Sequence, residues 1–292
     1  MDSNINLKNQ SWLVACVLTI GMTISCAPEK KEVSTTAEKV EVAPKEIGVQ
    51  IYSARDALKE DFKGTIKKVA DIGYKYVEAF GLGTDGMIKG MTPAEYKRIA
   101  DSLGVKVISV HATYFTPDQA DVMIKAAQEL GVEYLMIPWL NEDLRVDYEA
   151  IAANFNEVGK KFQGSGIKFG YHNHAFEFEP TPDGRIPEEI LIENTDPELV
   201  TFQADLYWVK KGGVDPMTLL KKYPGRFSLF HVKDADDSLN QTTVGEGIID
   251  FEEILKAKDL SGYQYYFVED ERTDDPLGNL QKAFDHLNTL DF

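Results

Sequence analysis

The chain from Ile47 to its end alternates short apolar runs with longer amphipathic segments. Runs of apolar, β-branched and aromatic residues are typical of buried strands, whereas apolar residues spaced by three and four are typical of helices. Eight runs of the strand type can be counted, and each is followed by a helical segment. They lie at residues 47–53, 76–80, 105–111, 134–139, 167–172, 200–205, 227–232 and 265–269.

Local signals mark the ends of several predicted helices. Thr92 and Thr116 are each followed by a proline, and Asp250 precedes an acidic first turn, so all three are expected to cap helix N-termini. Gly73 and Gly131 follow helical segments, where a left-handed residue is favoured. These signals support the alternation of strands and helices along the chain.

Eight strands alternating with helices predict an α/β fold, a single (β/α)8 TIM barrel over residues 46–292. A doubly wound sheet is the competing arrangement, and it usually carries a glycine-rich turn after its first strand. The chain instead reads Ser53-Ala54-Arg55-Asp56 at that point, without glycine. The sequence therefore favours the barrel.

The N-terminal segment predicts export. Residues 11–24 are uncharged and mostly apolar, follow Lys8, and are too short for a comfortable membrane span, although a retained anchor helix is an alternative. Thr23-Ile24-Ser25-Cys26 resembles a bacterial lipobox, which makes residues 1–26 a lipoprotein-type signal peptide. Residues 27–45 have the composition of a flexible tether. We expect an extracytoplasmic protein, facing the periplasm or on the cell surface, that meets the membrane only through a lipid on Cys26.

Charge and cysteine usage exclude several functions. The formal net charge of −17 repels a phosphate backbone, so nucleic acid is not an expected partner. Both cysteines, Cys16 and Cys26, lie in the predicted signal segment, which leaves the barrel without a thiol nucleophile. Phosphorylated sugars are cytoplasmic metabolites, so a neutral small-molecule sugar is the expected substrate. Nothing in the sequence indicates an oligomeric state.

Chemistry in such a barrel belongs at the carboxyl ends of the strands. His172 and His174 project to the same side of an extended segment there, and Asp205, His231 and Glu269 end three later strands. We predict that His172, Asp205, His231 and Glu269 bind one divalent metal ion. Two nitrogen and two oxygen ligands suit Mn, Co, Zn or Fe. Such an ion would act as a Lewis acid on an enediolate formed when a proton leaves the carbon next to a carbonyl.

Further strand-end residues have two interpretations each. Lys233 is predicted to be an electrostatic partner of the enediolate, or else part of a salt bridge. Glu78 and His111 are predicted to bind substrate hydroxyls, although a buried ion pair explains Glu78 equally well. Trp208, like Trp139, is predicted to stack on a sugar face, or else to pack at the rim. Glu177 reaches the site or lies in solvent.

Several of these segments resemble the xylose-isomerase-like TIM-barrel superfamily, in its sugar phosphate isomerase/epimerase branch, over about residues 46 to 290. The motifs that carry the resemblance are Ile47-Gly48-Val49-Gln50-Ile51-Tyr52-Ser53, Gly73-Tyr74-Lys75-Tyr76-Val77-Glu78, Asp205-Leu206-Tyr207-Trp208, His231-Val232-Lys233-Asp234, Val244-Gly245-Glu246-Gly247 and Phe267-Val268-Glu269. The resemblance implies a metal-dependent sugar isomerase or epimerase. Glu269 would then be both metal ligand and general base.

One position departs from the pattern of that branch. Epimerases of the superfamily place Glu where this chain has His172, whereas Asp205, His231 and Glu269 match. The resemblance leaves His174 or Lys233 to replace the missing acid/base. The His-x-His is instead similar to the inosose dehydratase branch, which makes a lyase that eliminates a β-substituent from a keto-sugar or keto-glycoside the first alternative.

Two functions without this chemistry compete. A non-catalytic, lipid-anchored sugar-binding protein would use the same scaffold. An endonuclease of the superfamily would need several zinc ions, more than the five histidines present, and a surface that tolerates a polyanion.

Overall fold

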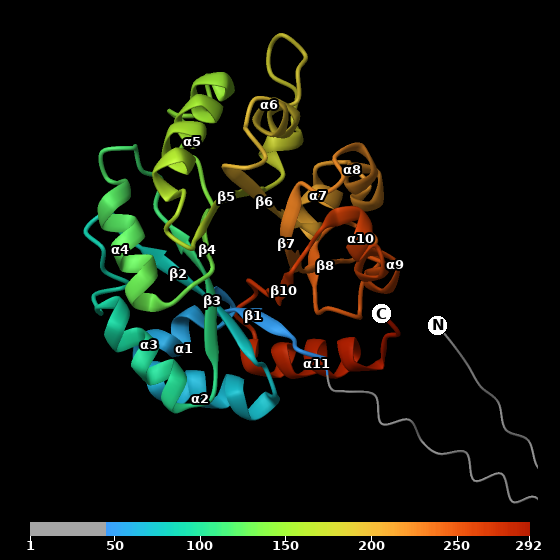
Figure 1. Ribbon diagram of the computed structural model, residues 1–292. Helices are drawn as coiled ribbons and strands as arrows, with labels where there is room; N and C mark the ends of the chain where they lie inside the picture. The colour runs from blue at the N-terminus through green and yellow to red at the C-terminus, as the bar shows by residue number, and fades with distance from the viewer. Residues whose placement is uncertain (1–44) are drawn as a thin grey trace, which may run out of the picture. The chain divides into compact units, whose positions relative to one another are not determined.

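The computed structural model describes residues 45–292, and in it eight parallel strands close into a barrel. The strand order around the barrel is β1, β10, β7, β6, β5, β4, β3, β2 (Figure 1). The strands are β1 (Gly48–Gln50), β2 (Tyr76–Leu82), β3 (Lys106–Ala112), β4 (Tyr134–Ile137), β5 (Lys168–His172), β6 (Val200–Asp205), β7 (Phe227–Val232) and β10 (Tyr265–Val268). The predicted (β/α)8 fold is confirmed.

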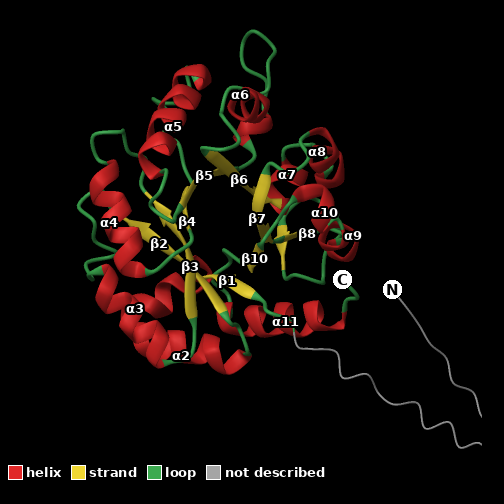
Figure 2. Cartoon of the chain, viewed as in Figure 1, coloured by secondary structure: helices red, strands yellow, loops and turns green. Residues whose placement is uncertain are grey.

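Helices surround the barrel on its outer face (Figure 2). They are α1 (Arg55–Glu60), α2 (Phe62–Ile72), α3 (Pro93–Ser102), α4 (Ala120–Leu130), α5 (Tyr148–Phe162), α6 (Pro187–Glu193), α7 (Leu206–Lys211), α8 (Pro216–Lys222), α9 (Phe251–Lys256), α10 (Lys258–Ser261) and α11 (Pro276–Thr289). Two 3₁₀ turns, η1 (Ile51–Ala54) and η2 (Phe176–Phe178), and a small hairpin of β8 (Asp234–Ala235) with β9 (Gln241–Thr242) complete the described elements. Over residues 45–292 none of the helices has the length and apolarity needed to span a membrane.

Most of the predicted caps form, and one does not. The Thr92 hydroxyl accepts from the Glu95 amide at the start of α3, and Asp250 caps α9. The helix predicted at Thr116 starts one turn later, at Ala120, so that prediction is wrong. The Thr116 hydroxyl binds the Asp118 carboxylate instead, and the intervening residues form a turn.

The barrel interior is layered, with apolar side chains at the amino ends of the strands and polar ones above them. The lower layer is a small cluster of inward-facing residues, namely Ile108, Tyr134, Met136, Leu229 and Phe267. Gly170 lets β6 and the Met136 side chain approach closely, because a Cβ there would lie 2.4 Å from the carbonyl oxygen of Thr201 and 2.6 Å from Met136 Cε. Outward-facing residues such as Val77, Tyr171 and Phe230 belong to the main core. This closely packed apolar layer supports the polar side chains above it.

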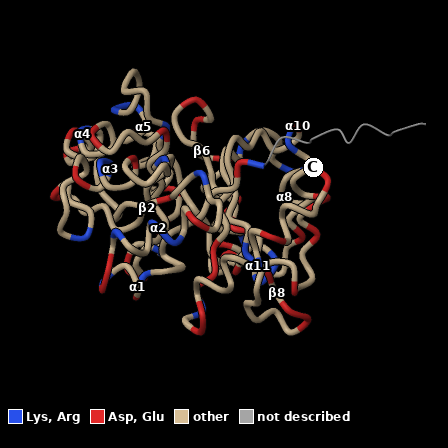
Figure 3. Tube along the Cα trace, turned by 90° about the horizontal axis from the view of Figure 1, so that it is seen from below, with Lys and Arg blue, Asp and Glu red and all other residues tan. Residues whose placement is uncertain are grey.

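The sequence-based predictions for residues 1–26 and for most of the tether, Cys26 included, lie outside the described residues. Within them, acidic segments gather around α11 and the β8 hairpin (Figure 3).

Candidate active site

Three of the predicted metal ligands converge at the carboxyl ends of neighbouring strands. Asp205 ends β6, His231 lies in β7, and Glu269 follows β10. One ligand atom from each of the three lies within 4.8 Å of the others, and all three side chains are buried. His231 Nδ1 is 3.1 Å from Glu269 Oε2 and 3.7 Å from Asp205 Oδ2.

The orientation of His231 is fixed from below by Glu78. Its Nε2–H donates to the Glu78 carboxylate, which leaves Nδ1 as the atom that faces Asp205 and Glu269. Glu78 also accepts hydrogen bonds from the side chains of three residues on β1, β3 and β6, namely Gln50, Ser109 and Gln203. Burial alone would raise the pKa of Glu78, but the histidines beside it and these donors lower the value to about 2. Glu78 is therefore an ionised anchor beneath His231, and it does not line the cavity above.

Asp205 has one satisfied and one unsatisfied carboxylate oxygen. Oδ1 accepts from the Trp208 amide and so caps α7, while the backbone amide of Asp205 donates to Asn173. Oδ2 is buried and has no hydrogen-bond partner among residues 45–292. It points at the cluster, 4.0 Å from His172 Nε2. A buried carboxylate oxygen without a donor is costly unless a cation meets it.

Lys233 lies among the carboxylates on one side of the cluster. Its ammonium group is 2.6 Å from Glu271 and 3.3 Å from Glu269, and it is fully buried. Burial alone would lower the pKa of Lys233, but the surrounding carboxylates outweigh it and hold the pKa above its ordinary value. Lys233 is therefore a permanent cation held beside Glu269.

The donor set fits a divalent metal ion. Four carboxylates, three of them buried, lie around His231 and Lys233, and when His231 is neutral the Lys233 ammonium group is the one positive charge among them. These carboxylates belong to Glu78, Asp205, Glu269 and Glu271. Without a metal, Nδ1 of His231 must carry a second proton to meet Glu269. Burial alone would lower the pKa of this imidazole, but the carboxylates around it raise the pKa well above normal. A cation at the Asp205, His231 and Glu269 atoms would replace that proton and reach the unpaired Oδ2.

Three other histidines, His111, His172 and His174, lie near His231. His172 and His111 form a second cluster with it, with ring centroids 4.5 Å and 5.3 Å from that of His231. His172 thus lies beside the triad, and its Nε2 is 4.0 Å from Oδ2 of Asp205. His174 lies between Trp139 and Trp208, and burial lowers its pKa to about 3.

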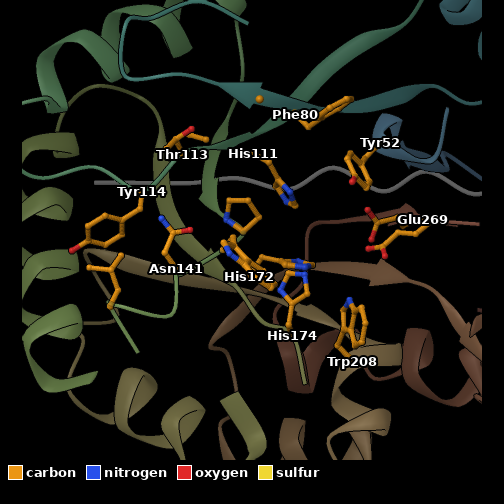
Figure 4. Close-up of a pocket in the computed structure, with 16 residues that line it drawn as sticks. Tyr52, Phe80, His111, Thr113, Tyr114, Asn141, His172, His174, Trp208 and Glu269 are labelled. Atoms are coloured by element: carbon orange, nitrogen blue, oxygen red, sulfur yellow. The ribbon is translucent and has the colours of Figure 1, made fainter. Parts of the chain in front are cut away.

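A cavity of about 670 Å³ opens above these residues (Figure 4). Figure 4 shows the imidazoles of His111, His172 and His174 at its centre and Glu269 at one side. The remaining lining is mostly aromatic, apolar or amide, from Tyr52, Phe80, Gly81, Ala112, Thr113, Tyr114, Pro138, Trp139, Asn141, Leu144, Trp208 and Glu271. Neither Lys nor Arg is among the described residues that line it, so the cavity offers a phosphate group two carboxylates and no cation.

Sequence reasoning missed two residues of this site and left one undecided. Glu271 lines the cavity and could have been found by its spacing of two from Glu269, and Gln203 by the same spacing from Asp205. Glu177 is fully buried, and its carboxylate accepts from the His174 amide and from the Tyr171 hydroxyl. It holds the loop after β5 in place from behind.

The closed barrel and its buried His, Asp and Glu cluster place the chain among (β/α)8 proteins that carry potential metal ligands at the carboxyl ends of their strands. Residues 66–290 match the sequence profile of the xylose isomerase-like TIM barrel, and the chain belongs to this family. It is 27% identical over 197 residues to an inosose dehydratase 2 of Bacillus cereus, covering 60% of this chain and 65% of that protein. The chain spans between half and two thirds of the length of such relatives.

Solved structures agree with this assignment. A sugar phosphate isomerase/epimerase from Parabacteroides distasonis is 29% identical, with a TM-score of 0.74 over 87% of this chain and 97% of that one. The IolI protein, whose structure holds a zinc atom, shares the fold with a TM-score of 0.64 at 16% identity, over 83% of this chain and 96% of the other. The names among these relatives include a dehydratase and an isomerase/epimerase.

Proposed function

We propose that the protein is a divalent-metal-dependent isomerase or epimerase of a non-phosphorylated sugar, which removes a proton from the carbon next to a carbonyl. The observation that carries this proposal is the convergence of Asp205, His231 and Glu269 below an open cavity, with Oδ2 of Asp205 buried and unpaired among the described residues. The zinc atom in the IolI structure and the isomerase/epimerase name of the Parabacteroides structure support it.

The proposed reaction is a proton transfer between neighbouring carbons. A carboxylate of Glu269 takes the proton, the carbon–hydrogen electrons form a carbon–carbon double bond, and the carbonyl oxygen gains the negative charge of an enediolate. Return of the proton to the adjacent carbon, together with transfer of the neighbouring hydroxyl proton to the former carbonyl oxygen, completes isomerisation. A divalent cation held by Asp205, His231 and Glu269 would supply Lewis-acid stabilisation of that charge. Lys233 does not line the cavity; it acts by holding Glu269 and Glu271 in place.

The absence of Lys and Arg from the described cavity lining supports a neutral sugar in the reactive position. Glu269 and Glu271 would repel a phosphate there, and the histidines facing it are kept uncharged by burial, as the lowered pKa values of His172 and His174 indicate. The exposed face of Trp139 suits the apolar face of a sugar ring.

A lyase is the second candidate, and one feature of the site favours it. Both cavity carboxylates, Glu269 and Glu271, follow β10, while the facing residues at the end of β5 and just after it are His172 and His174, and burial lowers the pKa of both histidines. An epimerase needs acid/base groups on both faces of a carbon, whereas an elimination can use one face. The inosose dehydratase relatives point the same way.

Hydrogen exchange with solvent tests the shared step. The purified protein is stripped of metal, reloaded separately with Mn, Co, Zn or Fe, and incubated in D₂O with non-phosphorylated ketosugars, aldosugars and keto-glycosides. Deuterium beside a carbonyl supports the proposal, and loss of water or an aglycone selects the lyase. Glu269→Gln should abolish exchange, whereas Glu133→Gln, an exposed carboxylate just before β4, should not change it. Sugar binding without exchange under every metal would leave only the non-catalytic alternative.

A further inference from the structure

A second cavity of about 640 Å³ adjoins the first, behind a wall formed by two aromatic side chains. Tyr52 and Phe80 line both cavities and meet edge to face, with ring centroids 5.1 Å apart. Tyr52 is 37% exposed, so a ligand that occupies both cavities would pass over this pair. The other apolar residues that line the second cavity come from the first helices, the loop after β2 and α3, and are Leu58, Phe62, Met91 and Tyr96.

Cations gather at this second cavity, although the described lining of the first has none. Arg55 lies over the Tyr52 ring at 4.6 Å, and Lys89 lies over the Phe80 ring at 4.8 Å. Arg55 donates to the backbone carbonyls of Tyr52 and Glu271, whereas the Lys89 ammonium group meets no hydrogen-bond acceptor in the described part of the chain. Neither forms a salt bridge with any residue in 45–292. Lys59, the third cation, is paired with Asp56.

The position of Lys89 is built into the backbone. Lys89 itself has a positive φ of 50°, and its side chain lies across Gly81, whose φ is +81°. A Cβ at Gly81 would lie 2.5 Å from Cε of Lys89, so only glycine lets the lysine stem lie there. The ammonium group of this exposed lysine lies beside the aromatic wall in a protein whose net charge is −17.

We propose that this cavity is a subsite for the aglycone of a glycoside, and that it takes an aromatic ring bearing an acidic group, while the reactive sugar occupies the first cavity. The aromatic and apolar walls would bury the ring, and Lys89 and Arg55 would meet the acid. The inference rests on the proposed function for the reactive sugar. A bare phosphate fits the walls less well, because four of the nine lining side chains are aromatic and two more are aliphatic or thioether.

Binding of unreactive glucosides tests the subsite without turnover. Dissociation constants of phenyl β-D-glucoside and 4-carboxyphenyl β-D-glucoside are measured by calorimetry at low salt on the full-length protein. We expect the carboxylate to tighten binding about fivefold, the upper range for an exposed ion pair, and the gain to shrink as salt rises. Lys89→Gln should remove this preference. Lys68→Gln on α2, an exposed lysine outside the cavity, is the matched control and should keep it.

The outcomes separate the subsite from the reaction. Equal affinities in the wild-type protein, or a preference that is undiminished in Lys89→Gln, would overturn the subsite. Binding of glucose 6-phosphate that depends on Lys89, with no gain from the carboxyphenyl group, would also overturn it and assign the cations to a phosphate. A preserved preference together with no deuterium exchange on any sugar would uphold the subsite and contradict the proposed reaction instead.

Discussion

His231 donates its Nε2–H to the buried carboxylate of Glu78, so the atom it presents to the cluster above is Nδ1. The contact joins the second and seventh strands of the barrel across its interior. A residue that fixes a ligating imidazole in this way typically contributes about ten- to a hundredfold to metal affinity.

Glu78→Gln is therefore expected to weaken metal binding by roughly tenfold or more. The amide oxygen is a poorer acceptor for His231 than a carboxylate, and the amide nitrogen adds a hydrogen-bond donor among side chains that already donate to this position. The measurement is a competition titration of Zn or Mn against a chromophoric chelator. Glu133→Gln is the control at the amino end of the barrel. An unchanged metal affinity in a folded Glu78→Gln protein would show that the hydrogen bond from His231 to Glu78 does not contribute to metal binding.

Lys233→Met should destabilise the metal-free protein more than the metal-loaded one. Removal of the ammonium group leaves the buried carboxylates of Glu269 and Asp205 with only the His231 imidazolium as a cation, a loss on the order of 3–5 kcal/mol. A bound divalent ion would compensate for part of that loss. Thermal unfolding with and without metal measures the difference. Lys256→Met, which breaks only exposed pairs with Glu252 and Asp291, should change little in either condition. Equal destabilisation with and without metal would show that the bound ion does not compensate for the loss of the Lys233 charge.

The sequence alone predicted the barrel, because strand and helix periodicities are local properties that each run of residues carries by itself. It also placed Asp205, His231 and Glu269 at one rim, since parallel strands put their carboxyl ends on the same face. It could not show that Glu78 points under His231 rather than at a substrate, because that depends on barrel closure and on the register between β2 and its neighbours.

Loops were less predictable than strands for a related reason. Glu177 lies in the loop that follows its strand motif, and the sequence left either the active site or solvent as its position. Only the packing of η2 against α6 and the hydroxyl of Tyr171 buries it. The second cavity could not be predicted from the sequence either, since the contacts of Arg55 with Tyr52 and of Lys89 with Phe80 depend on the folded structure.

Glu177 should make stability depend on pH. Burial raises its pKa from 4.5 to about 7, although Tyr171, the His174 amide and Arg145 favour the ionised form. The folded protein therefore holds a proton that the unfolded chain releases, so this contribution is present below pH 4.5 and is lost as the pH rises through 7. The shift corresponds to roughly 3 kcal/mol at most. Glu177→Gln should flatten the dependence of the unfolding free energy between about pH 5 and pH 7.5, measured by urea denaturation.

The matched control for that measurement is Glu179→Gln, an exposed carboxylate two residues further along, which should leave the profile unchanged. The glutamine at 177 can keep both contacts, with its carbonyl accepting from the His174 amide and its amide donating to the Tyr171 hydroxyl. A slope that is unchanged in Glu177→Gln would assign the dependence to other groups, such as the buried Glu188.

Glu188→Met is expected to stabilise the protein at neutral pH. Both carboxyl oxygens of Glu188 are buried without hydrogen-bond partners among the described residues. Burial, reinforced by the charge of Glu177, raises the pKa of Glu188 well above normal. Replacing an unsatisfied polar group by an apolar one of similar length should raise the unfolding free energy by about 1–3 kcal/mol. Glu189→Met, an exposed neighbour paired with Lys222, should stay within about 0.5 kcal/mol. Destabilisation by Glu188→Met would reveal a polar partner that the protein chain itself does not supply.

Trp139→Ala should weaken substrate binding with little effect on the chemical step. The indole is 47% exposed at the cavity, with Arg145 on one side at 4.4 Å and the His174 ring edge-on at 5.0 Å. A sugar ring stacked on the exposed face would lose on the order of 1 kcal/mol or more, which predicts a rise in KM of about five- to tenfold at nearly constant kcat. Trp139→Phe retains an aromatic face and should recover most of the affinity. A fall in kcat without a change in KM would instead mean that Trp139 positions His174 for the reaction.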